Sequence, residues 1–103
     1  MRNMLTVPST ARPLVPGPYE EIAVTGSVTT LTLANAQGCQ RAVVRFENAQ
    51  LRYTVDGKTT PTATVGWLAN DMDEEVFSGL EAINLQMIRV GSTNAIARVQ
   101  YLK

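Results

Sequence analysis

The chain has 103 residues, which is the size of one domain. Its hydrophobic content of 45% and charged content of 17% are typical of a folded protein rather than a disordered one. Nine basic and nine acidic residues cancel, which argues against binding to nucleic acid or to a membrane surface, because both depend on a positive field.

The residue types that are missing exclude most catalytic chemistry. The chain contains no histidine, which removes Ser-His and Cys-His pairs and every imidazole metal ligand. We expect its one cysteine, Cys39, to be a small buried side chain at the start of a strand. No stretch has the apolar length of a transmembrane helix. The sequence therefore predicts a protein that is not an enzyme, with no catalytic residue, cofactor or metal ion.

Residues 1–19 differ from the rest of the chain because they hold four of its five prolines. Proline fixes φ and lacks an amide donor, so this segment is neither a helix nor a central strand. It also carries apolar side chains, unlike a simple spacer. We therefore predict an extended N-terminal arm over residues 1–19 that lies on a partner subunit; a disordered tail is the alternative. The arm residues expected at the interface are Leu5, Val7, Leu14, Val15 and Tyr19.

From Glu20 onward apolar and polar residues alternate with a period of two, which is typical of half-buried strands. Asp56-Gly57 is a strong turn signal between two of these runs. The expected strands are 20–26, 28–33, 41–47, 51–55, 65–68, 75–77, 84–90 and 95–102. Seven or eight short strands at roughly this spacing predict an all-β fold, a small antiparallel β-sandwich over residues 20–103. Periodicity leaves jelly-roll and Ig-like strand orders open.

Two further features leave alternatives open. Trp67, the only tryptophan, is interpreted as a core residue, an interface anchor or a sugar-stacking platform. The acidic run from Asp71 to Glu75 is interpreted as a solvated loop tip, with a Ca²⁺ site as the alternative. The spacing of that run departs from an EF-hand loop.

The residues from Tyr53 to Thr62 read YTVDGKTTPT. This stretch resembles the Tyr-Thr-x-Asp-Gly-x-x-Pro-Thr corner of chitobiase C-terminal-like β-sandwich domains. The resemblance implies a strand that ends at Asp56-Gly57 and an extended segment that starts at Pro61-Thr62. It carries no catalytic residue.

A broader layout, from about Ile22 to Leu102, resembles small virion structural proteins of tailed phages. The matching segments are 31–33, 42–46, 51–57, 61–66, 88–91 and 97–101. The resemblance implies a compact β-domain that decorates or cements capsids, or that sits at head and tail joints. It defines no functional residue by a motif.

These observations lead to a functional hypothesis with an alternative. We expect a non-enzymatic virion structural protein, assembled in the host cytoplasm, that acts as a capsid cement or decoration protein. Its partners are the major capsid protein or other virion proteins, and it forms a homo-oligomer with a trimer as the favoured state; Trp67 joins the arm residues as an interface residue. The alternative is a carbohydrate- or receptor-binding β-sandwich module, or a head-tail or tail-fibre adaptor.

Overall fold

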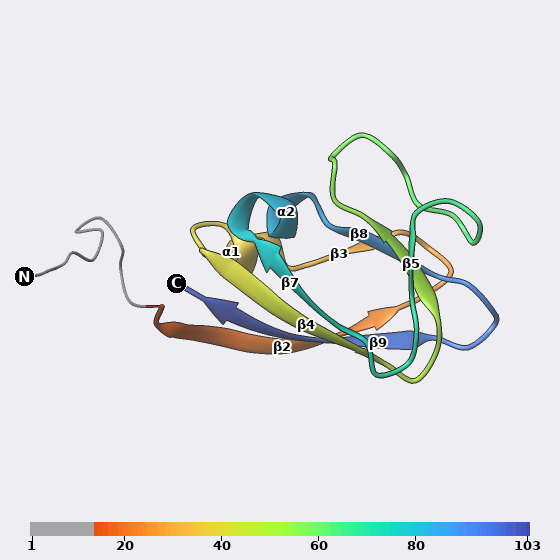
Figure 1. Cartoon of the computed structure of the whole chain (residues 1–103), viewed down its shortest axis with the longest axis horizontal. Coiled ribbons are helices and arrows are strands. Elements are labelled where there is room, and N and C mark those ends of the chain that lie inside the picture. The colour runs from red at the N-terminus through yellow and green to blue at the C-terminus, as the bar shows by residue number, and fades with distance from the viewer. Residues whose placement is uncertain (1–13) are drawn as a thin grey trace, which may run out of the picture.

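Two antiparallel four-stranded sheets pack face to face in the computed structural model, which describes residues 14–103 (Figure 1). The all-β prediction is therefore confirmed. The eight strands that these residues form are β2 (Pro16–Val24), β3 (Thr29–Thr30), β4 (Arg41–Glu47), β5 (Leu51–Thr54), β6 (Trp67–Ala69), β7 (Glu74–Ser78), β8 (Gln86–Arg89) and β9 (Ala95–Leu102). Two short helices, α1 (Leu33–Ala36) and α2 (Gly79–Asn84), complete the fold.

The strands pair in a nested order that starts with the two ends of the chain. β2 pairs with β9, β3 with β8, β4 with β7 and β5 with β6, always antiparallel. This is the pairing of one long hairpin, and rolling it up gives the sheets β2-β9-β4-β7 and β3-β8-β5-β6. Two four-stranded sheets with this connectivity form a jelly roll. The strand order thus selects the jelly roll from the two sandwich types that the sequence left open.

Alternating residues fill the space between the sheets, as their period predicts. In β9 the side chains of Ala95, Ala97, Val99 and Tyr101 are all fully buried. Tyr53 connects the two sheets, because its ring stacks on Phe46 at 5.7 Å between centroids and meets Phe77 edge-on at 5.4 Å. Aromatic pairs at these distances add to the stability that burial alone supplies.

Two of the predicted strands are shorter than expected because residues at their ends belong to helices. Residues 31–33 were expected in a strand, but Leu33 begins α1. The strand expected over 84–90 is shorter, because α2 ends at Asn84 and β8 covers Gln86–Arg89. At α2 the Ser78 side chain accepts from the Glu81 amide while the Glu81 carboxylate accepts from the Ser78 amide. This capping box is a local helix start that outweighs the period-two pattern around it.

Strand β2 lies at the edge of its sheet, where the prolines can be accommodated. It begins at Pro16, so residues 16–19, which the sequence analysis assigned to the arm, lie in the sheet. One residue earlier, the Val15 amide donates to the Lys103 carbonyl at 3.0 Å and the Lys103 amide donates to the Val15 carbonyl at 2.8 Å. The described chain therefore enters the domain beside its own C-terminus (Figure 1).

The half-buried carboxylate of Glu20 in β2 joins three segments. It accepts hydrogen bonds from the Tyr101 hydroxyl, from the Thr32 hydroxyl at 2.7 Å, from the Thr32 amide at 3.2 Å and from the Asn35 amide group at 3.2 Å. Burial raises the pKa of Glu20, but these hydrogen bonds, led by the one from Tyr101, outweigh burial and lower it below its ordinary value of 4.5. The folded state thus favours the ionised carboxylate.

A lowered folded-state pKa means that Glu20 stabilises the fold above pH 4.5, and that this stability is lost as pH falls through the folded-state pKa. We predict that Glu20→Gln lowers the free energy of unfolding at pH 7, because it removes the charge that accepts these hydrogen bonds. The loss should be only about 1–2 kcal/mol, because the carboxylate is partly solvated. Urea denaturation followed by circular dichroism at pH 7 and at pH 3 measures this. The difference between wild type and variant should shrink at the lower pH, and an unchanged difference would contradict the assignment.

Candidate functional site

The structure describes four of the six residues predicted at the interface. Leu14, Val15 and Tyr19 are exposed beside or within the start of β2, and Trp67 is exposed on β6. Leu5 and Val7 lie outside the described residues. The structure does not bring the four together, because β2 and β6 are edge strands of different sheets.

Trp67 is the first residue of β6 and is 69% exposed, so the interpretation of Trp67 as a core residue is wrong. It is paired in register with Tyr53 of β5, and among residues 14–103 no strand pairs with the other side of β6. A side chain on an edge strand has no further strand to cover it. The interface and sugar-platform interpretations of Trp67 both remain compatible with this position.

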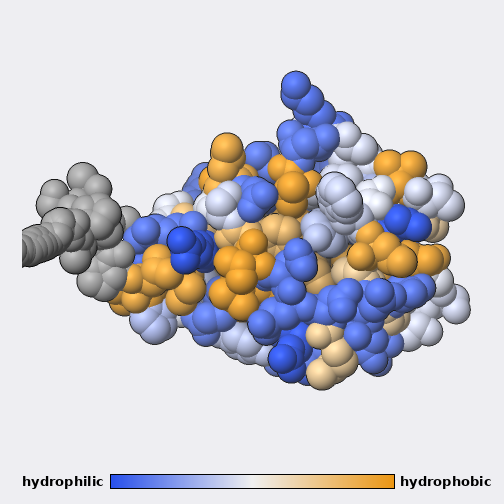
Figure 2. Space-filling view, viewed as in Figure 1, coloured by the Kyte–Doolittle hydropathy of each residue, from blue (hydrophilic) through white to orange (hydrophobic). Residues whose placement is uncertain are grey.

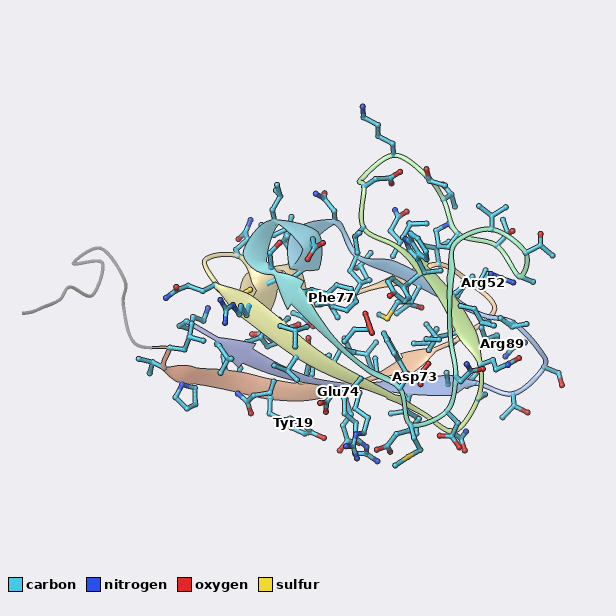
Figure 3. The ribbon with its side chains drawn as sticks, in the orientation of Figure 1. Tyr19, Arg52, Asp73, Glu74, Phe77 and Arg89 are labelled. Atoms are coloured by element: carbon cyan, nitrogen blue, oxygen red, sulfur yellow. The ribbon has the colours of Figure 1, made fainter. Side chains whose placement is uncertain are left out.

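The outer face of the β2-β9-β4-β7 sheet carries charges that neutralise one another. Arg98 of β9 pairs with Glu21 of β2 and, at 2.7 Å, with Glu47 of β4. These partners, led by Glu47, raise the pKa of the Arg98 guanidinium above its already high value. Tyr19 lies on this face, pointing away from the other sheet, and its hydroxyl donates to Glu21 at 3.1 Å (Figure 3). The face therefore offers little unpaired charge to a partner.

An exposed apolar cluster lies on the two helices, where sequence reasoning placed none. It consists of Leu33 on α1 and Leu80 and Ile83 on α2, and we call it the helical-end patch. Leu80 is 72% exposed, and Leu33 and Ile83 are also exposed although all three are large aliphatic residues. The small residues Ala36 and Ala82 are the ones that these helices bury. The signal that could have revealed the patch is the Ser78-x-x-Glu81 capping pattern around Leu80.

The chain enters and leaves the domain at the same end as the helical-end patch. The Lys103 ammonium donates to the Gln37 carbonyl next to α1, and the Gln40 amide donates to the Leu102 carbonyl at 2.7 Å. The Gly79 amide at the start of α2 donates to the Gln40 carbonyl at 3.0 Å. Figure 1 shows both helices and the C-terminus at this end, and Figure 2 shows apolar side chains interrupting the hydrophilic surface there.

A second surface feature is an open groove of about 340 Å³ where β5 ends and β6 begins. The residues that line it are Thr54, Val55, Asp56, Thr59, Gly66 and Trp67. The predicted Asp56-Gly57 turn forms one wall, with Gly57 at φ +72°. Asp56 accepts from the Lys58 amide at 2.9 Å, from the Thr59 amide at 2.8 Å and from the Thr59 hydroxyl at 2.6 Å. These bonds, with the Thr59 hydroxyl first, lower the pKa of Asp56 to about 2.

The carboxylates between Asp71 and Glu75 have separate partners. Asp71 accepts from the Asn48 amide at 2.9 Å, and Asp73 accepts from the Asn70 amide at 2.8 Å. Glu74 lies 3.7 Å from Arg45 and Glu75 accepts from the Tyr53 hydroxyl at 3.5 Å. Within residues 14–103 no group of three or more acidic, cysteine or histidine side chains is placed to hold a metal ion. The structure therefore gives the Ca²⁺ alternative no support.

Cys39 is buried just before β4, as predicted, and burial raises the pKa of its thiol. A thiol with a raised pKa is a poor nucleophile at neutral pH. None of the helices in the described part of the chain is long and apolar enough to cross a membrane.

Comparison of the chain with protein families, with curated proteins and with solved structures finds no match. The fold and its two surface features define the class: a small jelly-roll domain with an apolar patch on its helices and an exposed tryptophan beside a groove.

The position of Trp67 leads to a prediction about stability. Trp67→Ala should change the free energy of unfolding by less than about 0.5 kcal/mol, because little of the indole is buried. Phe46→Ala, which removes a fully buried ring, should cost about 3–5 kcal/mol in the same urea titration. A large loss for Trp67→Ala would mean that the indole packs against the domain.

A second prediction concerns Gly66, whose backbone lies close to the backbone of β5 just before β6 begins. Its φ is +120°, and a Cβ at this position would lie 2.9 Å from the Tyr53 carbonyl oxygen. We expect Gly66→Ala to cost about 1–3 kcal/mol of unfolding free energy. Gly91→Ala is the matched control, since a Cβ there meets no atom within 4 Å. Equal stability of the two variants would contradict the strain assigned to Gly66.

Proposed function

We propose that this chain is a non-enzymatic structural protein of a tailed-phage particle, a capsid cement or decoration protein. It binds the major capsid protein and neighbouring copies of itself, as a trimer, through its β-domain and its N-terminal arm. The observation that carries the proposal is the helical-end patch, which exposes Leu33, Leu80 and Ile83 at the end of the domain where the arm joins.

The architecture supports this role without deciding it. Jelly rolls are used in viral capsid proteins and in lectins. Because one fold serves many functions, the function of a jelly roll depends on its surface residues. Exposed apolar side chains on neighbouring elements, such as those of α1 and α2, are a feature of protein contact sites.

The energetics also favour a partner at the helical end. Complete burial of a fully exposed large aliphatic side chain contributes about 1.5–3 kcal/mol, and the three residues of the patch, which are partly buried already, would each supply a fraction of that. Leu14 and Val15 are exposed immediately before β2 and add apolar surface at the same end. An arm rich in proline loses less conformational entropy on binding than a flexible one.

The rest of the surface is consistent with recognition by shape and apolar contact. The chain has no net charge, and the outer face of the β2-β9-β4-β7 sheet pairs its own charges. A partner would gain little by long-range electrostatic attraction. Burial of the helical-end patch and of the arm is then the main source of affinity.

The test separates the arm from the patch. A truncated chain that begins at Leu14 keeps both hydrogen bonds between Val15 and Lys103, so the domain should unfold at the same urea concentration as the full chain. We expect the truncation to reduce co-sedimentation with undecorated capsids of the virus that encodes the protein by at least about tenfold. The double variant Leu80→Ser/Ile83→Ser should reduce it by a similar factor.

Val76→Ser is the matched control, because Val76 is an equally exposed aliphatic residue on β7 rather than on a helix. Light scattering over a range of concentrations reports self-association in the same samples. A full-length chain that stays monomeric and does not sediment with capsids would overturn the proposed function.

A further inference from the structure

The backbone around Trp67 holds the indole in a defined place although the ring itself is exposed. Arg52 of β5 donates from Nε to the Ala63 carbonyl at 3.0 Å and from a terminal nitrogen to the Gly66 carbonyl at 2.9 Å. These bonds hold the long connection between β5 and β6 against the sheet. Arg52 is labelled in Figure 3. Tyr53 then pairs in register with Trp67. A ligand that meets this ring does not have to order the chain that carries it.

The groove beside the ring has the size and chemistry of a small-ligand site. Its volume of about 340 Å³ falls at the lower end of the range for ligand pockets. Val55 and Trp67 supply apolar surface, and Asp56 and Thr59 supply polar atoms at its rim. Few polar groups on an apolar wall are what such sites use to orient a ligand.

The Asp56 carboxylate can accept a further hydrogen bond in addition to those that it accepts within the turn. One of its oxygens accepts from two backbone amides, while the other accepts only from the Thr59 hydroxyl. A carboxylate oxygen has two acceptor sites, so the second oxygen can still accept from a ligand hydroxyl. The low pKa of Asp56, about 2, keeps this acceptor ionised at neutral pH.

Of the residues that line the groove only Asp56 is charged, and its carboxylate disfavours an acidic ligand. Glu75 bonds to the hydroxyl of Tyr53, the residue paired with Trp67. Burial and the neighbouring carboxylates, led by Glu75, raise the pKa of Tyr53 to about 12. Two cations lie close by: the Arg52 guanidinium donates to the carbonyl of Gly66, and Lys58 belongs to the same turn as Asp56, but neither side chain lines the groove.

From these residues we infer that the groove binds a neutral saccharide. The apolar C–H face of one sugar ring stacks on the Trp67 indole, and a hydroxyl on the rim of the ring donates to the free acceptor site of Asp56. A sugar matches this combination because it has one apolar face and a polar rim, whereas a purely apolar ligand would make no use of the free acceptor site of Asp56. This site is separate from the helical-end patch and does not depend on the proposed role in a capsid.

The single tryptophan makes the test specific, because all indole fluorescence comes from the site. The full-length chain is titrated with chitotetraose, cellotetraose, mannotetraose and galactobiose, with sialyllactose as the acidic comparison. We expect at least one neutral sugar to change Trp67 emission in a saturable manner and to bind more tightly than sialyllactose.

Calorimetry then compares variants that lack the fluorescent ring. Trp67→Ala should weaken binding of that sugar by about tenfold or more, and Trp67→Phe should retain part of the affinity. The control is Leu68→Ala, which alters the next residue of β6, on the opposite face of the sheet, and should leave affinity unchanged. Urea denaturation of each variant checks that the fold is intact.

Four results would overturn the inference. The first three are no saturable response to any neutral sugar, tighter binding of sialyllactose than of every neutral sugar, and binding that Trp67→Ala leaves unchanged. The fourth is loss of self-association or capsid binding in Trp67→Ala, which would make the ring a protein anchor. The first three results do not bear on whether the arm and the helical-end patch bind a capsid.

Discussion

The Glu20 carboxylate is the interaction on which the arrangement of the helical end depends. It accepts hydrogen bonds both from Tyr101 of β9 and from Thr32 and Asn35 at the start of α1. Thr32 has no side-chain hydrogen bond of its own to cap α1. The helix is therefore placed by a residue of the edge strand twelve positions earlier in the chain. Without this bond α1 would lose the group that positions it against α2.

The nested strand pairing explains why the two candidate surfaces come from such different parts of the chain. Rolling up one long hairpin brings the first and last strands together, so the arm and the C-terminus meet at one end. The middle of the hairpin forms β5 and β6, whose connection carries Asp56 and Gly66 and leads into Trp67. The helical-end patch therefore lies near the ends of the hairpin, and the groove lies near its middle.

The two surfaces also differ in their physical character. The helical-end patch consists of the aliphatic side chains of Leu33, Leu80 and Ile83, which suit contact with a large protein partner that excludes water. The groove combines one aromatic face with an ionised acceptor, which suits a small ligand with both apolar and polar edges. The two surfaces are separate, so the proposed capsid contact and the proposed saccharide site would not compete.

The sequence by itself determined the features that depend on local periodicity and local turns. Alternation in residues 41–47 and 95–102 predicted two strands with their inward residues, and Asp56-Gly57 predicted the turn, because each signal lies within a few residues. Proline predicted that the N-terminal segment would not be a central strand. The local capping pattern at Ser78 was also present, but the period-two pattern concealed it.

Only the tertiary structure decided the strand order, the exposure of Trp67 and the helical-end patch. Whether an alternating run lies at an edge depends on which strand pairs beside it, and that partner is distant in sequence. α1 could not be read from residues 31–36 alone, since its start bonds to Glu20. The exposure of Leu33, Leu80 and Ile83 follows from the direction in which two helices bury their alanines, and long-range packing sets that direction.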